Sequence, residues 1–128
     1  GGMFKKRWGR IGDSPVIGAG TYADNNSCAV SCTGHGEYFI RHAVAFDVCA
    51  RYKYLKESVE KAADYIIHTE LNTNAGNGGL IAVDKLGNIA MPYNSGGMFR
   101  GFLYKEKGSP EIKKGCGIGK KIVVVGEK

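Results

Sequence analysis

Two amphipathic segments follow one another in the middle of the chain, and this succession constrains the fold more than any other feature. Apolar side chains recur at spacings of three and four over residues 37–54, and they do so again over residues 58–71. Segments that look like antiparallel strands lie on both sides of these two predicted helices. Two helices in succession between such strands favour an α/β (α+β) sandwich over a doubly wound parallel sheet.

Short apolar runs bounded by turn residues mark the strands. The clearest pair flanks a turn at residues 85–88 and predicts a hairpin. Pro92 has no backbone N–H, so it pushes the returning strand toward an edge or a bulge. The segment 105–121 is polar and glycine-rich, and no strand is predicted there. The predicted strands cover residues 15–23, 28–32, 79–84, 89–94, 98–104 and 122–125.

The net charge of +6 raises the question of a nucleic-acid partner. The basic residues gather in a leading run, residues 5–10, and in the tail after residue 104. Neither run has the interleaved aromatic side chains of an RNA- or single-strand-binding surface. We therefore expect solvated termini and no nucleic-acid partner. No membrane partner is expected either, because no apolar run approaches the roughly 18 residues of a membrane span.

The four cysteines are Cys28, Cys32, Cys49 and Cys116, and they form no CxxC pair and no zinc-finger spacing with histidine. They predict buried or partly buried free thiols in a reducing compartment. No secretory signal is visible, so a cytoplasmic protein is expected. No metal site and no cofactor are predicted. The chain begins with Gly rather than Met, which we interpret as a cut start.

A predicted strand ends in Thr33-Gly34-His35-Gly36 and leads directly into the first predicted helix. Backbone N–H groups at such a turn are free to point at an anion or a developing oxyanion, and Thr33 adds a hydroxyl donor. The alternative is a tight strand-to-helix turn with Thr33 near the helix cap. The motif alone leaves both interpretations open.

The loop at residues 9–14 places Arg10 and Asp13 three positions apart among glycines. A guanidinium binds a carboxylate and an aspartate accepts from an ammonium, so the pair could hold both charged groups of a free α-amino acid. A local ion pair between the two side chains at the surface is the simpler interpretation. Spacing alone favours that ion pair.

The histidines have no convincing partners in the sequence. His42 and His68 lie on predicted helices, and His35 lies in the Gly-x-Gly turn, where it could line a site. Ser31 and Cys32 lack the Gly-x-Ser-x-Gly context of a nucleophile elbow. The residues alone therefore indicate a binding site but no reaction.

Four stretches together resemble the β subunit of plant-type asparaginases, also called isoaspartyl peptidases: GGM at the start, GRIGDSPVIGAGTYADN, AVSCTGHGE and GGLIAVDKLGNIAMPYNSGGMFRG. The resemblance is collinear and covers residues 1–104, while the tail, residues 105–128, departs from the family. It implies that residues 1–104 are most of the β, or catalytic, subunit. The motifs are closer to this branch than to the glycosylasparaginases or threonine aspartases.

The resemblance implies an αββα sandwich of the N-terminal-nucleophile hydrolase type. It also implies a precursor that cleaves itself before a Thr, which then acts as the nucleophile with its own α-amine as the base. The implied substrates are L-asparagine and β-aspartyl dipeptides, and L-aspartate is a product. The implied partners are the α subunit of the same precursor and a second αβ unit.

The family's site residues carry over onto the two motifs described above. Arg10 matches the arginine that anchors the substrate α-carboxylate, and Asp13 matches the aspartate that receives its α-ammonium. Thr33 and Gly34 match the pair that supplies the oxyanion hole and orients the substrate. Gly36 matches a glycine whose backbone meets the polar head of the substrate. The resemblance therefore favours the amino-acid clamp over a local Arg10–Asp13 ion pair.

The nucleophilic Thr of the family has no counterpart in this chain, which starts at Gly1. The internal residues Thr21, Thr33, Thr69 and Thr73 carry no free α-amine. We therefore expect the chain to be an incomplete piece of a hydrolase that is inactive by itself. The alternative is a non-catalytic, truncated paralogue that retains only an aspartate-binding pocket.

Overall fold

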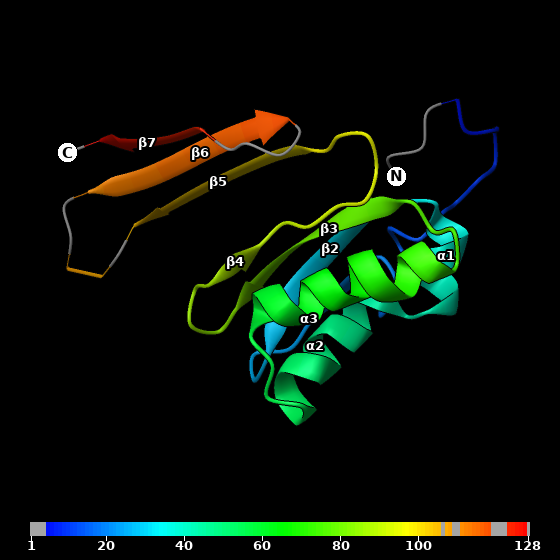
Figure 1. The fold of residues 1–128 in the computed structure, drawn as a ribbon, viewed down its shortest axis with the longest axis horizontal. Coiled ribbons are helices and arrows are strands. Elements are labelled where there is room, and N and C mark those ends of the chain that lie inside the picture. The colour runs from blue at the N-terminus through cyan, green and yellow to red at the C-terminus, as the bar shows by residue number, and fades with distance from the viewer. Residues whose placement is uncertain (1–4, 106, 109–110, 119–122, 128) are drawn as a thin grey trace. The chain divides into compact units, whose positions relative to one another are not determined.

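The computed structural model describes residues 5–105, 107–108, 111–118 and 123–127 (Figure 1). It divides the chain into two compact units, of which the first ends at Asn94 and the second begins at Ser95. Each unit has its own antiparallel sheet, and the helices all belong to the first unit among the described residues. Mixed helices and antiparallel sheets confirm the predicted α+β class.

Four strands form the sheet of the first unit: β1 (Thr21–Ala23), β2 (Cys28–Gly34), β3 (Gly78–Asp84) and β4 (Ile89–Ala90). They are antiparallel and lie in the order β1-β2-β3-β4. In the central pair, Cys28 lies opposite Asp84 at one end and Gly34 lies opposite Gly78 at the other. The predicted hairpin is confirmed, and β4 ends before Pro92.

The predicted strand over residues 15–23 is wrong for most of its length. Two successive turns occupy its first part, in which the Asp13 carbonyl accepts from the Val16 N–H and the Val16 carbonyl accepts from the Gly20 N–H. Only β1 pairs with a neighbouring strand in the sheet. These turns fold the Asp13 loop back toward the end of β2.

Four helical segments join β2 to β3: α1 (Gly36–Arg41), α2 (Val44–Tyr54), α3 (Val59–Tyr65) and the π-helical η1 (Ile66–Leu71). The prediction of one continuous first helix is wrong, because Ala43 has a left-handed φ of 46° and separates α1 from α2. The break has a tertiary cause. Ala45 N donates to the Ala19 carbonyl at 3.0 Å and Phe46 N donates to the Gly18 carbonyl at 2.8 Å. These bonds use N–H groups that the start of a helix leaves free.

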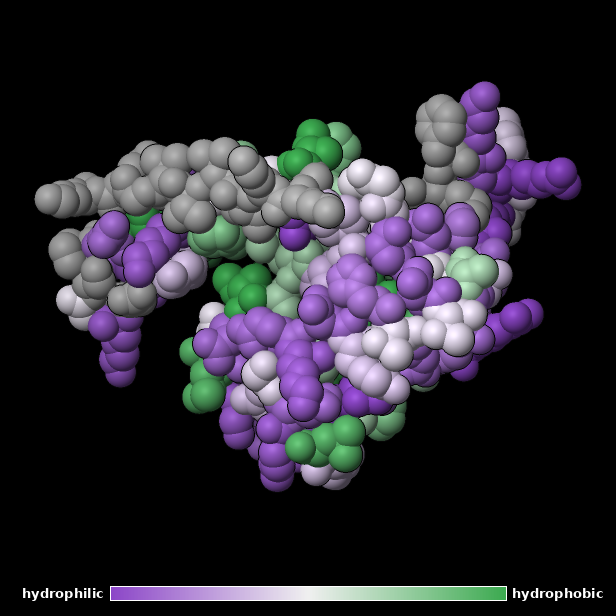
Figure 2. All heavy atoms as spheres, in the orientation of Figure 1, coloured by the Kyte–Doolittle hydropathy of each residue, from purple (hydrophilic) through white to green (hydrophobic). Residues whose placement is uncertain are grey.

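The second predicted helix is confirmed as α3 followed directly by η1. Ser58 caps it, since its hydroxyl accepts from Lys61 N at 3.2 Å. The outer side of the helices is mainly hydrophilic (Figure 2), in keeping with the exposed Glu60, Lys61 and Asp64. No helix in the part of the chain that the structure describes is long and apolar enough to cross a bilayer.

The core lies between the helices and one face of the sheet. Side chains along β2 and β3 alternate between buried and exposed, as the two-residue period of a strand requires. Val30 and Leu80 are buried on the helix side, where Phe39 of α1 is also fully buried. On the opposite face Ile81 and Val83 are 49% and 42% exposed. The described residues of this unit thus form one helical layer on one sheet, whose second face is open.

The prediction of four free thiols is wrong for two of the cysteines. Cys28, at the start of β2, and Cys49, in α2, form a disulfide with their Cα atoms 5.5 Å apart, and both are buried. Cys32 is free and buried, as predicted, whereas Cys116 is free but exposed, so the predicted burial is wrong for it. The two bonded cysteines are 21 residues apart and meet only because α2 packs on the sheet. The bond therefore ties α2 to β2.

Thiol titration tests this disulfide. In the denatured, unreduced chain we expect two reactive thiols, from Cys32 and Cys116, and four after reduction. In the full-length product, reduction of this bond should also lower the free energy of unfolding by about 3 kcal/mol, because the bond closes a loop in the unfolded chain between residues 21 apart. Four thiols before reduction would contradict the pairing.

Three strands form the second unit: β5 (Phe99–Lys105), β6 (Ile112–Ile118) and β7 (Val123–Glu127). They are antiparallel in the order β5-β6-β7. Strands were expected at β5 and β7, but β6 lies in the segment 105–121, where none was predicted. Lys113, Lys114 and Gly115 give β6 no apolar alternation, and its ladder with β5 depends on backbone groups that carry no sequence signal.

Candidate functional site

The Asp13 loop and the turn after β2 come together at one end of the first unit. Asp13 is only 1% exposed. A Cβ on Gly36, the first residue of α1, would lie 2.8 Å from the Asp13 nitrogen and 3.0 Å from its Oδ1. A Cβ on Gly20 would overlap the Asp13 carbonyl. Gly36 therefore lets the Asp13 loop approach the start of α1, and Gly20 lets it approach the turn before β1, more closely than any larger residue would allow.

The Asp13 carboxyl is buried, and one of its two oxygens lacks a hydrogen-bond partner among the described residues. Its Oδ2 has no hydrogen-bond partner among the described residues. Burial raises the pKa of this carboxyl, against the lowering effects of its own backbone N–H and of Arg10. An unpaired buried carboxylate oxygen is uncommon, because removing it from water without a partner costs free energy. A cationic group on a ligand would supply the missing partner.

Arg10 is held at the start of α1 by Glu37, a residue that the sequence motifs do not single out. Arg10 Nη2 lies 2.5 Å from Glu37 Oε2, and the two side chains are 32% and 48% exposed. The Glu37 backbone N–H, and after it Arg10, lower the pKa of the Glu37 carboxyl, so the pair is ionic. The simpler interpretation of a surface pair between Arg10 and Asp13 is wrong, because Asp13 is buried and Arg10 pairs with Glu37 instead. The position of Glu37 directly after the Gly-x-Gly turn was the signal that could have identified it.

The turn at the end of β2 packs against the backbone carbonyl of Asn77. Gly34 has a φ of 142°, and a Cβ on it would overlap the carbonyl oxygen of Asn77. The same oxygen accepts a hydrogen bond from His35 N at 2.9 Å. Thr33, directly before Gly34, is half-buried. The path of the backbone through this turn therefore depends on glycine at position 34 and on the placement of Asn77.

The structure brings the predicted site residues into one region. Arg10 and Asp13 both reach the first turn of α1. Thr33 and Gly34 end β2 immediately before that helix. The region offers a cation for a carboxylate, an acceptor for an ammonium, and the Thr33 hydroxyl as a donor for an oxyanion. These are the groups that recognition of an α-amino acid and of its side-chain carbonyl requires.

Cys32 is not an activated nucleophile, although it lies beside this region. Its side chain is buried in β2. Burial first, and the charge of Asp13 second, raise the pKa of the Cys32 thiol strongly. A thiol in such surroundings stays protonated at neutral pH and is inert.

Two of the histidines have partners, contrary to the expectation from the sequence. His42 Nδ1 lies 2.9 Å from Glu70 Oε1, and His68 Nε2 lies 3.7 Å from Asp64 Oδ1. The first pair links the end of α1 to η1, and the second is an i, i+4 pair on the surface of the second helix. Both pairs therefore have a structural explanation. No three side chains of His, Cys, Asp or Glu gather into a group that could hold a metal ion within the ranges that the structure describes.

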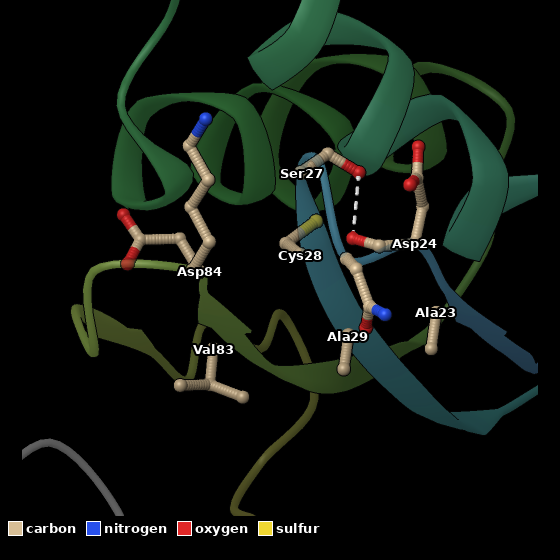
Figure 3. A pocket seen from close by; sticks show the side chains of 9 residues that line it. Ala23, Asp24, Ser27, Cys28, Ala29, Val83 and Asp84 are labelled. Carbon is tan, nitrogen blue, oxygen red and sulfur yellow. Dashed lines mark hydrogen bonds between the residues drawn. The ribbon is translucent and has the colours of Figure 1, made fainter.

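A hollow of about 370 Å³ lies at the other end of β2 and β3, with Asp24 and Asp84 on either side of it (Figure 3). Both carboxylates already have partners within the protein. Asp24 accepts from Lys53 Nζ at 3.0 Å, and Asp84 accepts from Asn88 Nδ2 at 2.8 Å. Asp24 also accepts from the Asn26 N–H, and Asp84 from the N–H groups of Leu86 and Asn88. We therefore assign these two residues to the turns and not to a ligand site.

The fold is of the α+β class, and comparisons with known proteins assign its family. The asparaginase family model matches residues 1–112. The chain belongs to this family, that of the plant-type asparaginases and isoaspartyl peptidases. The resemblance found in the sequence is thereby confirmed.

Individual relatives agree with this assignment. Over 104 residues the chain is 51% identical to the isoaspartyl peptidase of Salmonella typhimurium. The matched stretch covers 81% of this chain and 33% of that protein. The chain is 50% identical over 101 residues to the probable isoaspartyl peptidase/L-asparaginase 2 of Arabidopsis thaliana, with coverages of 79% and 30%. It is 42% identical over 98 residues to the isoaspartyl peptidase/L-asparaginase of Homo sapiens, with coverages of 77% and 32%. The chain thus spans about a third of the length of the curated relatives that it matches.

Proposed function

We propose that the whole protein hydrolyses the side-chain amide of L-asparagine and the isopeptide bond of β-aspartyl dipeptides, with L-aspartate as a product. The observation that carries the proposal is the buried Asp13 carboxyl, whose Oδ2 has no partner among the described residues, within the field of the Arg10 guanidinium. Family membership and the names of the relatives, isoaspartyl peptidase and L-asparaginase, support the same reaction.

The residues of this chain bind and orient the substrate in the proposed mechanism. Arg10 holds the α-carboxylate through its planar fork, and Asp13 accepts the α-ammonium. The side-chain carbonyl of the substrate then lies at the turn, where Thr33 and Gly34 stabilise the oxyanion that forms on attack. Gly36 leaves room for the polar head of the substrate. The nucleophile is an N-terminal Thr outside this chain, whose α-amine takes the hydroxyl proton.

Substrate entry requires a small rearrangement, because Asp13 is closed to solvent in this structure. Glu37 occupies Nη2 of Arg10, and the guanidinium has further N–H donors on its other edges. An exposed ion pair of this kind contributes only about 0–1 kcal/mol. Glu37 can therefore keep Arg10 in place without preventing the guanidinium from moving to a substrate carboxylate.

The assembly and location of the whole protein are also proposals. We propose that residues 1–104 are part of a β subunit, produced by self-cleavage and paired with an α subunit in a dimer of αβ units, and that residues 105–128 are a divergent tail. A cytoplasmic location is proposed as well. The Cys28–Cys49 disulfide is the observation that speaks against it, since disulfides are rare in reducing compartments.

A non-catalytic aspartate-binding protein is the second candidate function. It is favoured by the presence of the whole proposed clamp, from Arg10 to Gly36, within this chain. The open sheet face with Ile81 and Val83 argues against it, because exposed core surface promotes aggregation. We expect the isolated chain to aggregate or to stay molten. A cooperative thermal melt of the isolated chain, shifted upward by L-aspartate, would favour this second candidate.

The coding sequence upstream of Gly1 and the mass of the mature protein test the proposed chemistry. We expect a Thr that opens a Thr-Val-Gly-like strand shortly before Gly1. Mass spectrometry of the full-length product should find two polypeptides, the second beginning at that Thr. An intact single polypeptide without such a Thr would rule out an N-terminal nucleophile.

Replacing Glu37 by Gln in the full-length product should raise the KM for L-asparagine about two- to fivefold and leave kcat unchanged. The substitution removes the charge that holds Arg10, and an exposed ion pair contributes about 0.2–1 kcal/mol. Steady-state kinetics measure both parameters. Glu60→Gln is the matched control, because Glu60 is an exposed residue in the first turn of α3. A KM that falls would show that Glu37 competes with the substrate and does not position Arg10.

A further inference from the structure

Asn94 has an unusually complete set of hydrogen bonds at the end of the first unit. Its Oδ1 accepts from Gly78 N at 2.8 Å. Its Nδ2 donates to the Gly76 carbonyl at 2.8 Å and to the Ile67 carbonyl of η1 at 3.2 Å. Its backbone N–H donates to the Gly78 carbonyl at 2.9 Å. One half-buried side chain therefore joins η1 to the start of β3.

These bonds hold the segment 76–78 on both sides of Asn77. The Asn77 carbonyl is the acceptor for His35 N, and it lies against Gly34 so closely that no Cβ fits between them. Gly78 also pairs with Gly34 across β2 and β3. The turn that we propose as the oxyanion site thus rests on a carbonyl whose two neighbours are both bonded to Asn94.

We propose that Asn94 is a positioning residue for the hydrolysis. By holding Gly76 and Gly78, it fixes the Asn77 carbonyl and, through this carbonyl, the backbone at Gly34 and His35. Asn94 acts through Asn77 and not by contact with the substrate. The effect on catalysis rests on the proposed function, whereas the effect on the turn rests on the hydrogen bonds alone.

Asparagine is the side chain that this position requires. The Gly78 N–H needs an acceptor, while the carbonyls of Gly76 and Ile67 need donors, and only an amide offers both from one short side chain. These partners also fix which way the amide points. Aspartate would keep the bond from Gly78 but set an oxygen against two carbonyl oxygens. Alanine would remove all three side-chain bonds.

Kinetics of the full-length product separate positioning from general stability. Asn94→Ala and Asn94→Asp should each lower kcat for L-asparagine about 10- to 100-fold with KM changed less than threefold, because a displaced oxyanion turn weakens transition-state binding alone. Asn88→Ala is the matched control. Asn88 bonds Asp84 at the opposite end of β3, so its loss should lower the melting temperature without changing kcat of the folded protein.

Amide hydrogen exchange supplies a readout that does not depend on activity. In both Asn94 variants the His35 amide should exchange at least about tenfold faster than in wild type, while the Asp84 amide, bonded to the Asn88 carbonyl, should not change. Asn88→Ala should leave the His35 amide protected.

The outcomes distinguish failure of the proposed hydrolysis from failure of the positioning role of Asn94. If the wild-type product hydrolyses neither substrate, the proposed function fails and the His35 amide alone decides whether Asn94 fixes the turn. Unchanged protection of His35, or a kcat equal to that of wild type in an active enzyme, would overturn the inference. Loss of folding in both Asn94 variants would overturn it too, because Asn94 would then support the fold as a whole.

Discussion

Replacing Asp13 by Asn in the full-length product should lower kcat/KM for L-asparagine about a hundredfold or more, yet leave the free protein at least as stable as wild type. Removing one partner of a buried charge pair costs about 2–5 kcal/mol of binding, and the substrate ammonium would lose such a partner. The free protein loses nothing comparable, because Asp13 Oδ2 is buried without a partner among the described residues. Steady-state kinetics and denaturant titration measure the two effects separately.

The stability difference between Asp13→Asn and wild type should depend on pH in a definite direction. Burial raises the pKa of Asp13 in the folded state, so ionisation of Asp13 disfavours folding. Below about pH 3.9 the carboxyl is protonated in both states, and Asp13→Asn should have little effect. As the pH rises from there through the raised folded pKa, the stability advantage of Asp13→Asn should appear and then level off.

Asp84→Asn is the matched control, since Asp84 is equally a buried carboxylate but one with partners. Bonds from Asn88, Leu86 and Gly87 outweigh the effect of burial and lower the pKa of Asp84. Asp84→Asn should therefore destabilise the protein at neutral pH, and this loss should shrink as the pH falls through the lowered pKa. If Asp13→Asn destabilised the protein as much as Asp84→Asn does, Asp13 would be a structural residue and the proposed clamp would fail.

Gly34→Ala should abolish most of the activity of the full-length product and lower its free energy of unfolding by about 2–4 kcal/mol. A residue with a side chain is strained at a φ of 142°, and the added Cβ would overlap the Asn77 carbonyl and lie 2.6 Å from the Gly78 Cα. The turn must shift to relieve the overlap, which displaces the proposed oxyanion donors. Urea titration and kcat at saturating substrate are the measurements.

Gly87→Ala is the control that separates the two effects of Gly34→Ala, which are the overlap with Asn77 and the strain of a positive φ. Gly87, in the turn after β3, also has a positive φ, of 90°, but a Cβ added there would meet nothing within 4 Å, so only the strain remains. We expect this substitution to cost about 1 kcal/mol and to leave kcat unchanged. Equal effects of the two substitutions would remove the close contact between Gly34 and Asn77 from the explanation.

The parts of the fold with local causes could be predicted from the sequence. Two apolar runs around a turn predict the β3–β4 hairpin. The apolar stripe and the Ser58 cap predict the helix over residues 58–71. The two site motifs were visible for the same reason, because glycine-rich loops with Arg10 and Asp13, and with Thr33 and Gly34, stand out locally.

The features that were missed depend on contacts between distant residues. The break at Ala43 contains no glycine or proline, and it arises from backbone bonds to Gly18 and Ala19. The partner of Arg10 is Glu37, which lies 27 residues away, and the partner of Cys28 lies 21 residues away. A local pattern cannot encode such pairs, since they form only when the Asp13 loop and α2 pack around the end and face of the sheet.

Hydrolysis of L-asparagine by the full-length product tests the central claim most directly. We expect equal amounts of ammonia and L-aspartate to appear with time, together with splitting of the polypeptide in two, and we expect Asp13→Asn to remove most of this turnover. A product that remains a single polypeptide, binds L-aspartate and releases no ammonia would contradict the account and would leave the binding protein as the function of this chain.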